Sequence, residues 1–154
     1  MTTPDRHIDR TLEINSRTDL LGDVRAFVTR AAADFGFGGD DVGAIELAVD
    51  EAITNIIKHA YKYDPSGVIR VVVTTQENGE GRGRFTVSIS DTGISFDTSR
   101  YHAPDMAEYF RTLRRGGLGI VLMNKLMDEV IYDIHPGAAN HLRLVKYRAS
   151  SSLS

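Results

Sequence analysis

The chain has 154 residues, of which 42% are hydrophobic and 25% charged, and its formal net charge is −3. This composition is typical of a soluble globular domain, and the slight negative charge argues against duplex DNA or an anionic membrane as a partner. Cysteine is absent, which excludes a disulfide framework, a thiol nucleophile and a cysteine metal site. No apolar run reaches the roughly 20 residues that span a bilayer, and residues 1–14 lack the apolar core of a signal peptide. We therefore expect a cytoplasmic protein.

The length predicts a single domain over residues 1–154, and the small, polar residues 149–154 predict a disordered tail. The predicted elements cover the chain between its two ends. The predicted elements, in chain order, are a strand at 7–14, helices at 16–36 and 40–61, strands at 67–76 and 84–91, a helix at 118–128, and strands at 128–135 and 141–148. Neighbouring strands in this order favour antiparallel pairing. The predicted fold class is α+β: a two-layer sandwich with a mixed, mostly antiparallel sheet and helices on one face.

Local signals set the limits of the first two helices. Ser16 or Thr18 can cap the first helix, and Gly36, Gly38 and Gly39 end it. Asp40 or Asp41 can cap the second. The only long irregular stretch, 92–117, contains a short helical piece, and long connections in compact domains are usually functional or disordered.

The second helix carries polar residues where an ordinary amphipathic helix needs none. In ELAVDEAITNIIKHAY (46–61), Glu51, Asn55 and His59 follow one another at four-residue spacing along the margin of an apolar stripe. Glutamate can accept a proton from an alcohol or water, and an asparagine oxygen suits a Mg²⁺ ion already bound by phosphate and water. The alternative is a solvated helix face, with His59 as a packing or capping residue.

A carboxylate ends the strand at 84–91. In RFTVSISDTGISFD, Asp91 should face the helix layer together with the apolar residues of that strand. A buried carboxylate needs a donor, and the exocyclic amine of a bound ligand is one candidate. Gly93 would let a flat ligand approach the backbone. The alternative is that Asp91 simply begins a turn.

Glycines precede the helix that begins near residue 118. In RRGGLGIVLMNKL (114–126), Gly116, Gly117 and Gly119 leave backbone N–H groups exposed at a helix start, which favours an anion. Arg114 and Arg115 add positive charge upstream. The pattern is neither a P-loop nor a Rossmann fingerprint.

In this order, E-x-x-x-N-x-x-x-H, D-x-G-x-x-F-D and G-G-L-G-I resemble the N, G1 and G2 boxes of the Bergerat-fold (GHKL) ATPases, which include gyrase, Hsp90, histidine kinases and MutL. The sequence is most similar to the anti-sigma-factor serine kinases of the RsbW type, over residues 8–147. The resemblance implies the Bergerat ATP-binding fold, with ATP and Mg²⁺ as cofactors.

The resemblance also implies a role for each matching residue. Glu51 would be the general base that accepts the proton of a substrate serine, and Asn55 would bind both the nucleotide and Mg²⁺. Asp91 would accept a hydrogen bond from the adenine amine, in a pocket shaped by Gly93. The remaining implied nucleotide contacts come from Thr54, Arg115, Gly117, Leu118 and Gly119.

The implied activity is that of an ATP-dependent protein-serine kinase and anti-sigma factor. Such a protein phosphorylates a STAS-type anti-sigma antagonist and sequesters a sigma factor, in transcription regulation and stress response. The family admits a homodimer, and we expect no direct nucleic-acid or membrane partner. One alternative is a nucleotide-dependent protein-binding switch of the same fold without significant kinase activity. Another is an α+β domain that binds no nucleotide.

Overall fold

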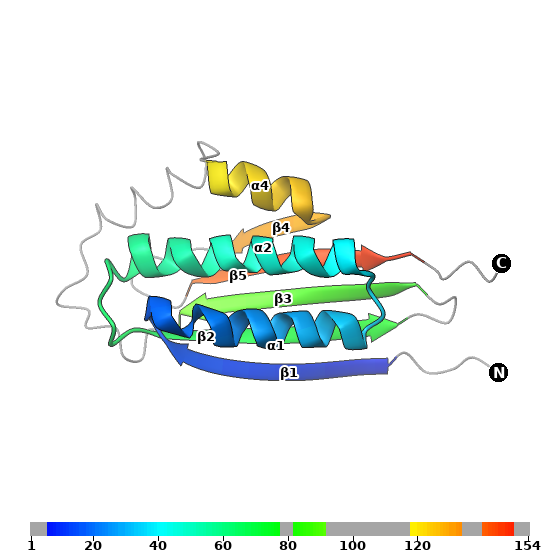
Figure 1. Cartoon of the computed structure of the whole chain (residues 1–154), viewed down its shortest axis with the longest axis horizontal. Helices are drawn as coiled ribbons and strands as arrows, with labels where there is room; N and C mark the ends of the chain where they lie inside the picture. The colour runs from blue at the N-terminus through cyan, green and yellow to red at the C-terminus, as the bar shows by residue number, and fades with distance from the viewer. Residues whose placement is uncertain (1–5, 78–81, 92–117, 134–139, 150–154) are drawn as a thin grey trace.

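The computed structural model describes residues 6–77, 82–91, 118–133 and 140–149. Within them, a five-stranded sheet forms one layer, and helices cover one of its faces (Figure 1). The strands are β1 (Arg6–Asn15), β2 (Val68–Glu77), β3 (Gly83–Asp91), β4 (Glu129–Asp133) and β5 (His141–Arg148), and the α-helices are α1 (Leu21–Asp34), α2 (Gly39–Asn55) and α4 (Leu118–Leu126). The predicted α+β two-layer sandwich is confirmed. No helix of the described residues is long and apolar enough to cross a membrane.

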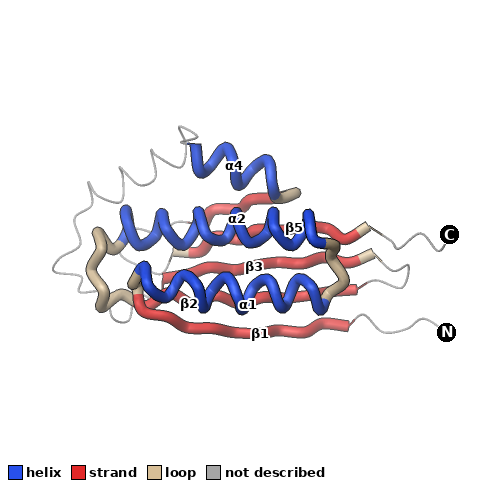
Figure 2. The backbone as a smooth tube through the Cα atoms, in the orientation of Figure 1, coloured by secondary structure: helices blue, strands red, loops and turns tan. Residues whose placement is uncertain are grey.

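The strand order in the sheet is β1-β2-β3-β5-β4. All four pairings are antiparallel, so the sheet of the described residues contains none of the parallel pairing that a mixed sheet would have. β4 precedes β5 in the chain but lies at the edge of the sheet, which leaves β5 between β3 and β4 (Figure 2). This crossover brings the end of β3 beside the start of β5, and Ser90 pairs with His141 there.

One face of the sheet and the facing helix stripes form the core. The alternation predicted for β3 is observed, because Phe85, Val87 and Ile89 are almost fully buried. α2 is the middle helix of the layer and contacts both α1 and α4 (Figure 1). Its buried residues are Ile45, Ala48, Val49, Ala52 and Ile53.

Helix α1 ends at a glycine, as predicted, but none of the predicted cap residues caps a helix. Gly36 has φ of 102°, and the N–H groups of Gly36 and Phe37 bond the carbonyls of Ala33 and Ala32 in a Schellman arrangement. The helix starts without a side-chain cap, after the 3₁₀ turn η1 (Thr18–Leu20).

Tertiary contacts explain why the cap predictions were wrong. Ser16 is buried and donates its hydroxyl to the carbonyl of Asp64 instead of capping a helix. At α2 the N-cap is Gly38, and Asp40 and Asp41 lie in the first turn, where they still favour the helix dipole.

The last turn of the second helix is a π-helix, η2 (Ile56–Ala60), which the sequence pattern did not predict. A π turn holds more residues than an α turn, so side chains beyond Asn55 are rotated relative to an α-helical count. Ile57, which lies in this turn, is 1% exposed. Lys62 and Tyr63 follow with positive φ values of 50° and 63°, and they reverse the chain towards β2.

Candidate functional site

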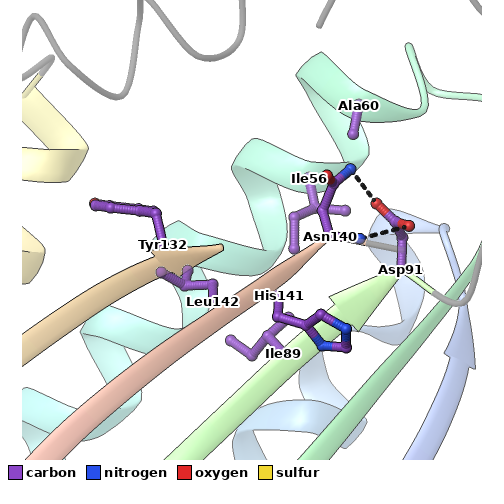
Figure 3. A pocket seen from close by; sticks show the side chains of 8 residues that line it. All are labelled: Ile56, Ala60, Ile89, Asp91, Tyr132, Asn140, His141 and Leu142. Atoms are coloured by element: carbon purple, nitrogen blue, oxygen red, sulfur yellow. Dashed lines mark hydrogen bonds between the residues drawn. The ribbon is translucent and has the colours of Figure 1, made fainter. Parts of the chain in front are cut away.

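A hollow lies where the end of the second helix meets the ends of β3 and β5 (Figure 3). The empty space between its walls is about 300 Å³, and this figure includes open solvent. Its walls are mostly apolar, with polar groups from only a few side chains. The lining residues are Ile56, Ala60, Ile89, Asp91, Tyr132, Asn140, His141 and Leu142.

Asp91 is the buried carboxylate of this hollow. It is 9% exposed and lies at the end of β3, facing the helix layer as the alternation predicted. Its Oδ2 accepts a hydrogen bond from Nδ2 of Asn140 at 2.9 Å, and its Oδ1 accepts one from the backbone N–H of Asn140 at 3.3 Å (Figure 3). Burial raises the pKa of the Asp91 carboxyl, while the Asn140 hydrogen bonds and the nearby His141 limit the rise.

Two tyrosines stand near the same space. Tyr61 is buried, and its hydroxyl donates to the carbonyl of Val68 at 2.8 Å. Burial and the Asp91 carboxylate both raise the pKa of Tyr61. Tyr132 lies away from Asp91 in Figure 3, and its buried hydroxyl has no hydrogen-bond partner among the described residues. Burial raises the pKa of Tyr132 as well.

The N-box residues lie on the helix that forms one wall of the hollow. Glu51, Thr54 and Asn55 are half-buried near the C-terminal end of α2. They do not line the hollow; Ile56 and Ala60, which follow Asn55 in the chain, do. The structure thus places the predicted base and amide on the helix end that adjoins the Asp91 carboxylate.

Only some of the remaining predicted nucleotide-binding residues lie within the described part of the chain. Gly93, Arg115 and Gly117 lie outside the described residues, and so does the side chain of His59. Leu118 and Gly119 form the first turn of α4, whose observed start matches the predicted one.

Asn140 is the site residue that sequence reasoning missed. It lies in the connection between two predicted strands, where an asparagine is typical of a turn. The strand register reveals its position, because the Ser90–His141 pair puts residue 140 opposite Asp91. Only a correct alignment of β3 with β5, separated in the chain by a long connection, could have found it.

No group of three His, Cys, Asp or Glu side chains able to hold a metal ion occurs in the described part of the chain. At the helix end, Asn55 offers a neutral amide oxygen beside the Glu51 carboxylate and the Thr54 hydroxyl. An amide oxygen fits Mg²⁺ as a single ligand when phosphate and water supply the others. These residues therefore suit an ion that arrives with a nucleotide, not an ion held by protein alone.

Comparison with known proteins agrees with this geometry. The histidine kinase-like ATPase domain family matches residues 14–146. Because this match covers most of the chain, the chain is an ATPase domain of the histidine kinase-like class.

Curated relatives narrow the class. The chain is 32% identical to the serine-protein kinase RsbW of Bacillus cereus (strain AH820) over 123 residues, which cover 77% of this chain and 73% of the relative. It is 30% identical to RsbW of Bacillus subtilis (strain 168) over 141 residues, 88% of this chain and 83% of the relative. The chain belongs to the RsbW branch of the histidine kinase-like ATPase family.

A solved structure supports the fold. The crystal structure of the RsbU and RsbW domains of Rv1364c from Mycobacterium tuberculosis matches 99% of this chain with a TM-score of 0.56 at 21% identity. The chain spans only 35% of that larger chain. At this identity the likeness concerns the fold alone.

Proposed function

We propose that the chain is an ATP-dependent protein-serine kinase that also acts as an anti-sigma factor. The observation that carries the proposal is the buried Asp91 carboxylate in an otherwise mostly apolar hollow, beside the helix end with Glu51 and Asn55. Apolar walls can bury the faces of a flat base, and the carboxylate can accept a hydrogen bond from its exocyclic amine. Adenine of ATP is the proposed base, with Gly93 shaping its pocket.

In the proposed reaction, Oγ of a substrate serine bonds to the γ-phosphorus of ATP, the bond to the β–γ bridging oxygen breaks, and ADP leaves. Glu51 orients the serine hydroxyl and accepts its proton. Asn55 would hold Mg²⁺, which would offset phosphate charge when bound. The remaining phosphate contacts are assigned to Thr54, Arg115, Gly117, Leu118 and Gly119.

The proposed protein substrate is a STAS-type anti-sigma antagonist with an acceptor serine. When the antagonist is phosphorylated, the kinase would bind and sequester a sigma factor instead. Support comes from relatives named serine-protein kinase RsbW and from the three boxes read in the sequence. A homodimer stays a prediction.

Phosphate transfer from labelled Mg-ATP to a purified STAS-type antagonist tests the proposal. Glu51→Gln keeps the size of the side chain but removes the base, so transfer should fall by about 10²–10⁴-fold. ATP affinity, measured by calorimetry, should stay close to that of the unmodified protein. Glu46→Gln is the matched control, because Glu46 is also a half-buried glutamate of α2, and it should leave transfer unchanged.

Two results would contradict the proposal in different ways. Undiminished transfer by Glu51→Gln would remove Glu51 as the base. Tight ATP binding with nucleotide-dependent capture of the antagonist or the sigma factor, but no phosphate transfer, would favour the binding switch over the kinase.

A further inference from the structure

The Asp91 carboxylate is held by Asn140, which lies outside the three sequence boxes described above. Asn140 immediately precedes β5 and donates both its side-chain amide, at 2.9 Å, and its backbone N–H, at 3.3 Å, to the two carboxylate oxygens (Figure 3). The two residues are 49 positions apart in the chain. The contact therefore depends on the pairing of β3 with β5, and both residues line the same hollow.

The pairing has a direct physical consequence for the carboxylate. An ionised carboxylate is costly to bury unless donors satisfy its oxygens, and hydrogen bonds to charged groups are about twice as strong as neutral ones. A carboxylate has about four acceptor positions. Among the described residues, Asn140 occupies two of them, which leaves positions for a donor from a ligand in the hollow. Two donors on different oxygens also fix the plane of the carboxylate.

We infer that Asn140 is a positioning residue for base recognition, which holds the Asp91 carboxylate ionised and oriented so that it can accept a hydrogen bond from the exocyclic amine of adenine. This inference rests on the proposed function, because it assigns the partner of Asp91 to ATP. Asn140 acts through Asp91, and the adenine amine occupies a carboxylate position that Asn140 leaves open.

Two other titratable groups among the described residues interact electrostatically with Asp91. His141 of β5 is exposed and favours the ionised carboxylate, and Tyr61 after η2 is itself affected by the carboxylate charge. His141 acts on Asp91 through its charge, which does not fix the plane of the carboxylate. Removal of Asn140 alone therefore separates orientation and hydrogen bonding from these electrostatic influences.

The test uses Asn140→Leu, which keeps a similar side-chain volume without a donor, and Asn124→Leu, the same change at an exposed position of α4, as the control. Two quantities are measured in each full-length protein. One is the pKa of the Asp91 side chain, from carbon NMR without nucleotide. The other is the dissociation constant for Mg-ATP, from calorimetry. Asn140→Ala carries the same test if Asn140→Leu fails to fold.

Asn140→Leu should raise the pKa of Asp91 and weaken ATP binding about tenfold, as expected for the loss of a hydrogen bond to a charged group. Asn124→Leu should change neither quantity. An unchanged pKa of Asp91, unchanged ATP affinity, or tighter ATP binding, which would mean that Asn140 competes with the base, overturns the inference alone. Absence of ATP binding by the unmodified protein overturns the proposed function, and the inference with it.

Discussion

Gly67 lies where three parts of the chain touch, and adding one methyl group there tests that packing. A Cβ at residue 67 would lie 2.5 Å from two ring carbons of Tyr61 and 2.6 Å from Oγ of Ser16. Neither neighbour can move into solvent, because Tyr61 is 4% and Ser16 1% exposed. Both are also tied by hydrogen bonds, Tyr61 to Val68 and Ser16 to Asp64. Gly67→Ala should therefore destabilise the fold.

Overpacking of a core typically costs about 1–3 kcal/mol of unfolding free energy, and we expect the upper part of this range, about 2–3 kcal/mol, because the neighbours cannot move. The unfolding entropy of a 154-residue chain is about 0.3 kcal/mol per kelvin, so the expected fall in Tm is about 6–9 °C. Thermal unfolding of the nucleotide-free protein, followed by circular dichroism, measures it. Gly43→Ala is the matched control, because Gly43 is exposed within α2 and a Cβ there meets nothing within 4 Å.

The control should behave in the opposite way. Alanine is favoured over glycine inside a helix by about 1 kcal/mol, so Gly43→Ala should raise Tm by about 3 °C. In a Tyr61→Leu background, Gly67→Ala should cost less, since the ring it meets is absent. A Tm for Gly67→Ala equal to or above that of the unmodified protein would refute the packing of Tyr61 against Gly67.

Three other predictions concern named contacts. Burial raises the pKa of Asp91 in the folded chain, so at a pH above the ordinary pKa of aspartate the folded state holds more protons than the unfolded state. The contribution of Asp91 to stability therefore falls as pH rises. The stability of Asp91→Asn relative to the unmodified protein, from urea unfolding, should thus increase from about pH 4 to about pH 7; a constant difference contradicts this. Lys146→Met should lower stability by about 1–2 kcal/mol, because Nζ of Lys146 bonds the carbonyl of Leu126 at the end of α4; unchanged urea unfolding would dismiss that contact. Arg148→Met should cost about 2 kcal/mol, since the guanidinium stacks 4.3 Å from the centre of the Phe35 ring and bonds the Phe35 carbonyl; full rescue of Tm by Arg148→Lys would show that charge alone matters.

The fold was predictable because its signals are local. Alternation in 84–91 fixed the buried face of β3, and a glycine at 36 marked the end of α1, where φ is positive. Both depend on a residue and its near neighbours. The side-chain caps failed because Ser16 has a tertiary partner, which sequence periodicity does not contain.

The candidate site was predictable to a lesser extent. Asp91 could be found, because strand alternation directs it to the helix layer. Asn140 could not, because its position depends on the register between two strands far apart in the chain. The π turn after Asn55 was equally hidden, since it changes the helical period without an unusual residue. The roles of Glu51, Thr54 and Asn55 stay predictions.

The crossover that leaves β5 between β3 and β4 determines when a nascent chain can complete the hollow. Asp91 leaves the ribosome well before Asn140, and the two meet only after β5 has been synthesised and has paired with β3. A translation intermediate that stops short of β5 would have the N-box helix and the aspartate but not the wall opposite them. Nucleotide could then bind only after the last step of sheet assembly. Its binding would stabilise the folded state of the newly made chain, because a ligand that binds only the folded state shifts the folding equilibrium towards it.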